Sequence, residues 1–192
     1  MIERRAFLAV AGTTLAGGVL AACGSGGQDD SNGIATATGA EQSTAASADV
    51  SILNQALAVE QRAVATYQTA AQHLSGARRR TAQHFEAQER MHVDALSQAV
   101  LALGATPTTA RDRYALPPLS DDDAVLRFTM GVEQIAVAQY LDLIPKLSSQ
   151  NLRGTFASIL TVEAEHLSLL LAALDEPRIP EAFVTGTLAE GE

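Results

Sequence analysis

The chain has one cysteine, one lysine and no tryptophan among its 192 residues. A single cysteine excludes an internal disulfide and any metal site built from paired cysteines. Aromatic residues make up only 4% of the sequence, so the core has to be aliphatic, and the abundant alanine and leucine favour closely packed helices over sheets. The formal charge of −9 argues against a nucleic-acid partner, because phosphate binding requires a basic surface.

The first residues also lack an apolar run long enough to cross a membrane, since glycine and threonine interrupt residues 1–22. Arg4-Arg5 followed by an apolar stretch indicates an export signal and resembles a twin-arginine signal, which exports folded proteins. Residues 20–23 resemble a bacterial lipobox, so we expect cleavage before Cys23 and lipidation of that residue. The predicted location is the cell envelope, on the outer face of the cytoplasmic membrane or in the periplasm. An uncleaved signal anchor with an incidental Cys23 is the alternative.

Composition divides the remainder into three segments. Residues 23–48 are mostly small or polar, which is typical of a flexible tether. Residues 49–175 contain the regularly spaced apolar residues expected of the folded domain. Residues 176–192 hold two prolines and form a predicted tail that could pack Ile179 and Phe183 against the domain.

Inside the predicted domain, one segment occurs nearly twice. Residues 59–67 (VEQRAVATY) return as residues 132–140 (VEQIAVAQY), identical at seven of nine positions. About thirty residues after each copy comes a Glu-x-x-His motif, first Glu89 with His92 and then Glu163 with His166. A glutamate helix followed by a Glu-x-x-His helix, present in two copies, is the ligand pattern of a di-metal carboxylate four-helix bundle.

Four helices are therefore predicted, arranged as two hairpins. Local signals place their ends at a Ser47 or Asp49 start, a Ser75-Gly76 turn, a Gly104 stop, an acidic cap at 120–123, a break at Pro145 and a Ser149 or Asn151 start. Residues 104–119 contain three prolines and no helical period. Extended, they reach about 53 Å, whereas a helix of 26 residues is about 39 Å long. The connection can thus cross the whole bundle and let the second and third helices run parallel.

The glutamates of the repeat fall on the apolar stripes of these helices, which points them into the core. A buried, unpaired carboxylate costs several kcal/mol, and no basic residue repeats at matching positions. Four carboxylates and two neutral imidazoles balance two divalent cations, and their oxygen and nitrogen donors suit iron, or else manganese. The predicted ligands are Glu60, Glu89, His92, Glu133, Glu163 and His166.

Helical spacing also predicts how the ligands divide between the ions. Glu89 and Glu163 are expected to bridge both ions, with one histidine and one outer glutamate on each ion. Tyr67 and Tyr140 lie two turns beyond Glu60 and Glu133 and are expected either to support the ligands by hydrogen bonds or simply to pack in the core. The other candidates on these helices have no repeat partner and are predicted to be surface residues: His73, His84, Glu86 and Glu165.

These motifs resemble those of the ferritin-like superfamily, in particular the exported bacterial ferritin-like proteins with a twin-arginine signal. The resemblance covers residues 49 to about 175 and implies a di-iron or di-manganese centre in an all-α, ferritin-like four-helix bundle. The chain has no rubredoxin-like cysteine set, so it is not a complete rubrerythrin. A lipid anchor suits a monomer or small homo-oligomer better than a closed storage shell.

Three functions compete at this stage. The first is a membrane-tethered di-iron oxidoreductase in which Fe(II) reacts with O2 or peroxide, with iron or the peroxide as substrate. The second is a non-enzymatic metal-binding or stress-protective protein. The third is a structural bundle with a vestigial site.

Overall fold

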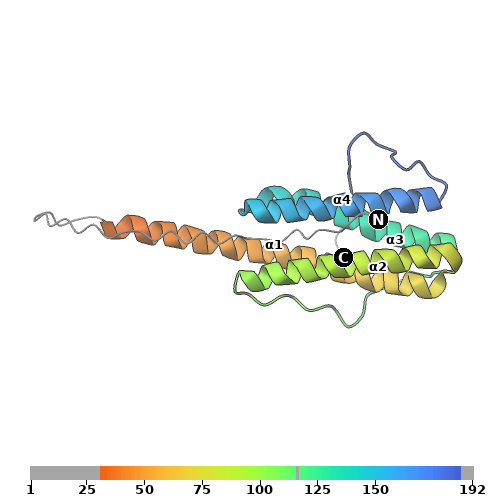
Figure 1. Cartoon of the computed structure of the whole chain (residues 1–192), viewed down its shortest axis with the longest axis horizontal. Helices are drawn as coiled ribbons and strands as arrows, with labels where there is room; N and C mark the ends of the chain where they lie inside the picture. The colour runs from red at the N-terminus through yellow and green to blue at the C-terminus, as the bar shows by residue number, and fades with distance from the viewer. Residues whose placement is uncertain (1–30, 116, 187–192) are drawn as a thin grey trace, which may run out of the picture.

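The computed structural model describes residues 31–115 and 117–186, and all regular structure within them is helical (Figure 1). Four helices and one short 3-10 turn form an antiparallel bundle. They are α1 (Ser31–His73), α2 (Gly76–Ala102), α3 (Asp122–Leu143), η1 (Ile144–Lys146) and α4 (Gln150–Ala173). The predicted architecture, an all-α four-helix bundle of two hairpins with a long connection between the second and third helices, is confirmed.

Two apolar clusters show how the helices run. One cluster joins Leu53 of α1 and Phe156 of α4 to the C-terminal turns of α2 and α3. The other joins the end of α1 and the end of α4 to the first turns of α2 and α3. The starts of α2 and α3 also meet directly, because Arg78 Nη1 donates to Asp122 Oδ2 at 2.9 Å. Helices α2 and α3 are therefore parallel, as the length of their connection predicted.

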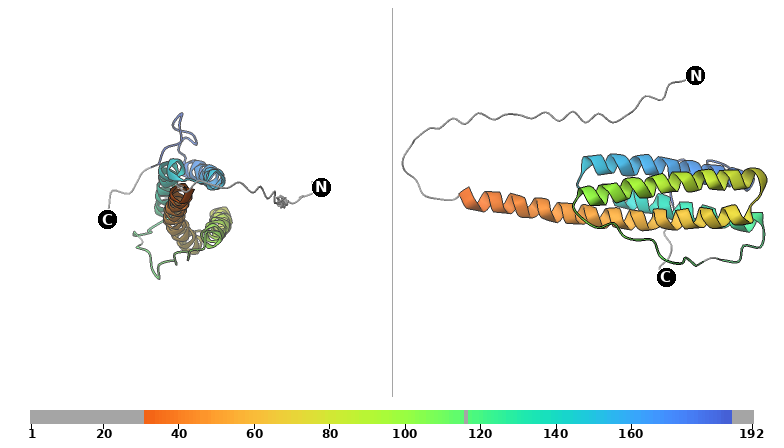
Figure 2. Two further views of the ribbon diagram at one scale, coloured as in Figure 1. Left: turned by 90° about the vertical axis from the view of Figure 1, so that its left-hand side faces the viewer. Right: turned by 60° about the horizontal axis from the view of Figure 1, so that its bottom comes forward.

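The connection between α2 and α3 runs along the outside of the bundle for its full length (Figure 2). Thr108 ties it to α1: its N–H donates to Asn54 Oδ1 at 2.7 Å, and its carbonyl accepts from Gln61 Nε2 at 2.8 Å. These bonds satisfy backbone groups that have no partner in a helix. The loop is thus anchored to the first helix between its two ends.

The predicted helix ends agree with the structure at several places. Gly104 follows α2 with φ +74°, a conformation that favours glycine. Asp121 caps α3 by accepting from Ala124 N at 2.8 Å, and Ser149 caps α4 by accepting from Leu152 N. Pro145 lies in η1 directly after α3, because it cannot supply the backbone donor that a continuing helix needs.

The start of α1 differs from the prediction. The helix begins at Ser31, so residues 31–48, predicted as part of a flexible tether, are helical. The segment is rich in alanine and has no proline, and extending a formed helix adds one hydrogen bond for each residue that is fixed. Neither Ser47 nor Asp49 caps α1. Asp49 is buried instead, and its carboxylate accepts bonds from Ser148 N, Ser148 Oγ and Ser149 N at 2.8, 2.7 and 3.1 Å.

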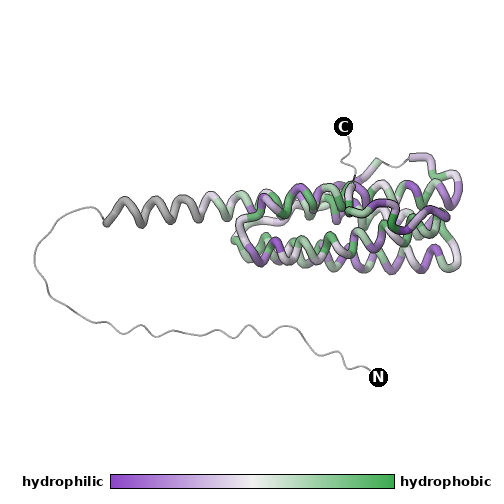
Figure 3. Tube along the Cα trace, turned by 90° about the horizontal axis from the view of Figure 1, so that it is seen from above, coloured by the Kyte–Doolittle hydropathy of each residue, from purple (hydrophilic) through white to green (hydrophobic). Residues whose placement is uncertain are grey.

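Hydrophilic and hydrophobic residues alternate along the helices of the bundle, as expected for helices with one buried face (Figure 3). Helix α4 is long and apolar enough to cross a membrane, by length and composition alone. Its midsection, however, carries Glu163 and His166, both buried against the other helices. We therefore assign α4 as a core helix of the bundle.

The tail after α4 leaves the bundle and returns to it. Ile179 and Phe183 are 82% and 83% exposed, so the expected packing of these two side chains does not occur. The chain comes back at Gly186, which lies so close to the backbone of Gln134 and Ala138 that a Cβ atom has no room there. The tail therefore contacts α3 through backbone.

Candidate metal centre

The six predicted ligands come together halfway along the bundle, between the two apolar clusters. Helix α1 provides Glu60, α2 provides Glu89 and His92, α3 provides Glu133, and α4 provides Glu163 and His166. All four glutamates are 0% exposed, and both histidines are buried. Two overlapping groups result, in each of which the nearest ligand atoms lie within 4.8 Å of one another.

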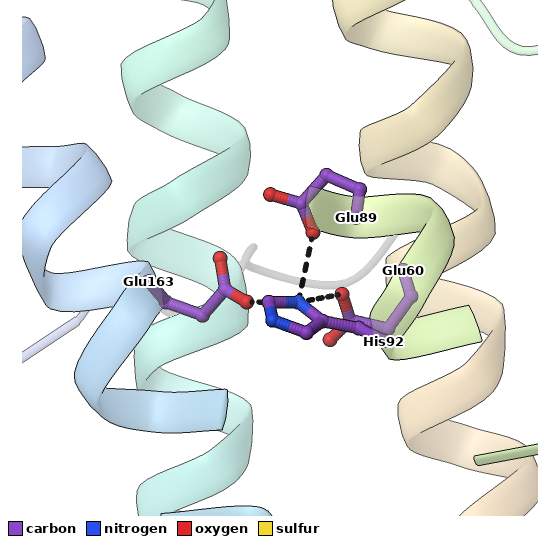
Figure 4. Close-up of side chains that lie close together, drawn as sticks. All are labelled: Glu60, Glu89, His92 and Glu163. Atoms are coloured by element: carbon purple, nitrogen blue, oxygen red, sulfur yellow. Dashed lines mark hydrogen bonds and ion pairs between the residues drawn. The ribbon is translucent and has the colours of Figure 1, made fainter. Parts of the chain in front are cut away.

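The first group surrounds the imidazole of His92 (Figure 4). Its Nδ1 lies 3.0 Å from Glu163 Oε1 and 3.3 Å from both Glu60 Oε2 and Glu89 Oε2. Three carboxylates from three helices thus converge on one nitrogen.

The second group repeats this arrangement around His166. Its Nδ1 lies 3.0 Å from Glu89 Oε1, 3.3 Å from Glu133 Oε1 and 3.6 Å from Glu163 Oε2. Glu89 and Glu163 belong to both groups, and each directs one oxygen to His92 and the other to His166. This is the placement expected of two carboxylates that bridge a pair of ions.

The two tyrosines connect the repeats crosswise. Tyr67 donates its hydroxyl to Glu133 Oε1, and Tyr140 donates to Glu60 Oε1. Because α1 and α3 run in opposite directions, the residue two turns beyond each glutamate lies opposite the glutamate of the other repeat. Each outer carboxylate is therefore held by a hydrogen bond from the neighbouring hairpin.

Two neighbours of His166 were missed by the sequence analysis. Its Nε2 lies 3.0 Å from Gln88 Oε1, and a proton held there leaves the Nδ1 lone pair facing the centre. Phe85 stacks on the same ring, with centroids 3.9 Å apart. Neither residue recurs in the second repeat, which has Val162 and Ile159 at the matching positions. A comparison of the two repeats therefore could not identify Gln88 or Phe85 as neighbours of the centre.

The four titratable residues predicted to lie on the surface are not part of the centre. His73, His84 and Glu165 are exposed. Glu86, one turn before Glu89, pairs with Arg90 at 2.8 Å instead of reaching inward.

Without metal, protonation of the outer glutamates and of the histidines balances the negative charge of the buried carboxylates. Burial raises the pKa of Glu60 and Glu133 well above the ordinary glutamate value, and the neighbouring charge of Glu163 acts in the same direction. Burial opposes the charged forms of the histidines, but the surrounding carboxylates outweigh it and raise the pKa of His92 to about 12 and of His166 to about 11. Burial likewise disfavours charge on Glu89, yet the two neighbouring histidines lower its pKa to about 2.

The protons do not satisfy every group. Buried atoms without a hydrogen-bond partner among the described residues are Glu89 Oε1, Glu133 Oε2, both carboxylate oxygens of Glu163 and His166 Nδ1. Unpaired buried polar atoms are costly, and here they all point into one place. Four carboxylates and two imidazoles fit two divalent cations in charge and in donor type.

Comparison with known proteins supports this description. The family model for the ferritin-like domain matches residues 48–176. No curated protein matches the chain.

The solved structures that share the fold include three from different bacteria. A conserved hypothetical protein of Mycobacterium tuberculosis is 21% identical with a TM-score of 0.63, over 66% of this chain and 97% of that one. A ferritin-like, diiron-carboxylate protein of Bacillus anthracis is 23% identical with a TM-score of 0.57, over 68% and 97%. A Dps mutant of Listeria innocua is 12% identical with a TM-score of 0.60, over 68% and 95%. At these identities the likeness establishes the fold.

Proposed function

The chain belongs to the ferritin-like domain family, and on this basis we propose that its centre binds two divalent metal ions and acts as a di-metal oxidoreductase. Iron is the first choice of metal and manganese the second. The reaction is the oxidation of Fe(II) coupled to the reduction of O2 or peroxide.

One observation supports this proposal more than any other. Glu89 and Glu163 each present one oxygen to the His92 group and the other to the His166 group. A site for a single ion would not require two carboxylates that each face two separate histidine groups. The Bacillus anthracis protein, a diiron-carboxylate protein with the same fold, supports this assignment.

The side chains would divide the work as follows. Glu60 and His92 would hold one ion, Glu133 and His166 the other, and Glu89 and Glu163 both. Two bound Fe(II) ions would supply the two electrons that convert one H2O2 and two protons to two waters. Tyr67 and Tyr140 hold the outer carboxylates in place by donating hydrogen bonds to them. The apolar cluster beyond the His92 group separates that side of the centre from bulk water.

Anaerobic loading with Fe(II) followed by H2O2 or O2 tests the activity. We expect two Fe(II) ions to be taken up per chain and oxidised together, with two consumed for each H2O2, and a transient coloured product to appear. Stable uptake without oxidation would instead support the non-enzymatic metal-binding alternative. No uptake would support a structural bundle with a vestigial site.

We further propose that the protein is exported and anchored by lipid at Cys23, which lies outside the described residues together with the whole signal segment 1–22. The twin-arginine and lipobox resemblances support this location. In the native host, Cys23→Ser is expected to move the protein from the membrane fraction to the soluble fraction or to leave its signal uncleaved. Membrane attachment with normal cleavage in this variant would contradict lipidation.

A further inference from the structure

The two ends of the bundle differ in how well they are filled, although the repeat relates them. Residues 73 positions apart match between α1 and α3, and residues 74 positions apart match between α2 and α4. Beyond the His92 group, Leu143 and Phe156 are buried in a cluster of large side chains. The matching positions beyond the His166 group hold Ala70 and Ala82, which are also buried.

A pocket of about 240 Å³ occupies this less filled end. All four helices contribute to its wall, and the pocket opens to solvent at exposed residues of α2 and α4. Small side chains form much of the wall, including Ala70, Ala82 and Ala173. The pocket therefore arises where the first repeat has alanine in place of the larger residues of the second.

The aromatic residues show the same difference. In the second repeat, Phe156 fills the space at the matching end and meets Tyr140 edge-on, with centroids 5.1 Å apart. In the first repeat the phenylalanine lies one turn closer to the centre, at position 85, and meets Tyr67 edge-on at 5.5 Å. Phe85 stacks on His166 from there, and the volume beside Ala82 stays open.

The deep wall of the pocket touches the centre. Tyr67 lines the pocket and donates its hydroxyl to Glu133. Phe85 lines it as well and stacks on His166 at 3.9 Å. A molecule in the pocket thus contacts two side chains that hold the Glu133 and His166 half of the centre.

The outer wall is polar and open to solvent. Arg78 lines it with a side chain that is 42% exposed and bound to Asp122, and the exposed Thr81 lies one turn further along α2. A guanidinium and a hydroxyl at the mouth suit a ligand with a polar or anionic end. The remaining lining favours an apolar body.

We propose that this pocket binds a small, mostly apolar organic molecule, about the size of a bicyclic aromatic ring, against the two side chains that support the His166 side of the centre. The size follows from the volume, since an engineered apolar cavity of about 150 Å³ binds benzene. An effect of the molecule on bound metal rests on the proposed function, whereas binding of the molecule does not.

Indole is a suitable probe because the protein has no tryptophan, so indole fluorescence can be followed without background from the chain. With the full chain in the presence of a chelator, we expect saturable binding and a blue shift of indole emission. Ala82→Phe and Ala70→Leu introduce the residues of the second repeat and should each weaken binding at least tenfold. Ala87→Phe, at an exposed position of α2, is the matched control and should bind indole as the wild type does.

Cobalt(II)-loaded protein then tests contact with the centre. Indole is expected to change the visible absorption of bound Co(II) in the wild type and not in Ala82→Phe, while both proteins take up the same amount of metal. If Ala82→Phe does not fold, Ala70→Leu decides the question. Absence of indole binding, or equal binding by the filled variants, overturns the pocket. Indole binding without a cobalt response overturns its link to the centre. Failure of metal uptake alone refutes the proposed function and leaves binding of the molecule intact.

Discussion

Replacing Glu163 by alanine is expected to abolish binding of both metal ions, whereas replacing His92 removes mainly one. Glu163 presents an oxygen to each histidine group, so its loss removes a ligand from both ions. His92 belongs to one group only, and His166 with Glu133 remains for the other ion. Metal content per chain after equilibrium dialysis against Mn(II) or anaerobic Fe(II) distinguishes the two outcomes.

The thermal midpoint should follow metal content. With free metal at about 1,000 times Kd, a ligand that binds only the folded state stabilises it by about 4 kcal/mol, which corresponds to a shift on the order of 10 °C for a chain of this size. The wild type should show this shift and Glu163→Ala should not. Glu165→Ala, an exposed residue on the same helix, serves as control and should keep both the metal and the shift. A Glu163→Ala protein that still binds two ions would disprove the bridging role.

Metal affinity is expected to rise steeply with pH, because the metal-free centre holds protons that the ions displace. The pKa of His92 is raised to about 12 and that of His166 to about 11, so both imidazoles are protonated at neutral pH without metal. Burial also raises the pKa of Glu60 and Glu133 well above normal. Metal ligation requires all four groups to be deprotonated.

By linkage, each displaced proton makes binding tenfold tighter per unit rise in pH. The logarithm of the combined affinity for two ions should therefore increase with pH with a slope of two from the histidines, approaching four wherever both outer glutamates are protonated. Metal affinity changes in this direction because the pKa values of these groups are raised in the metal-free protein. Protons compete with the metal most strongly at low pH, so the stability that metal provides is lost as the pH falls. Chelator competition between pH 6 and 8, with proton release measured by a dye, checks this.

Glu60→Gln provides the matched variant for the pH experiment. Its amide keeps nearly the same shape and still accepts a bond from Tyr140, but it has no proton to release. The slope should fall by as much as one, and overall affinity should also fall because one anionic ligand is lost. A wild-type slope below two would show that the histidines are not protonated in the metal-free centre.

Much of the architecture could be predicted because its signals are local. Asp121, Ser149 and Gly104 mark helix ends through bonds and backbone angles within a few residues of themselves. The parallel course of α2 and α3 followed from the length of the connection. The glutamates and histidines stood out because they recur at a constant offset on apolar stripes, where a lone carboxylate would be costly.

The sequence by itself therefore determined the four helices except for the start of α1, the long connection, and the six side chains that converge. Contacts between residues far apart in the chain were decided only by the tertiary structure. Asp49 could be read as a local helix cap, but it binds Ser148 and Ser149 across the bundle. Gln88 contacts His166, and Phe85 stacks on the same imidazole ring, which leaves a pocket next to Ala82. Both contacts depend on how α2 packs against α4. Helical periodicity specifies which face of a helix is buried, whereas the partner of each buried side chain depends on the axial register between helices, which no local pattern encodes.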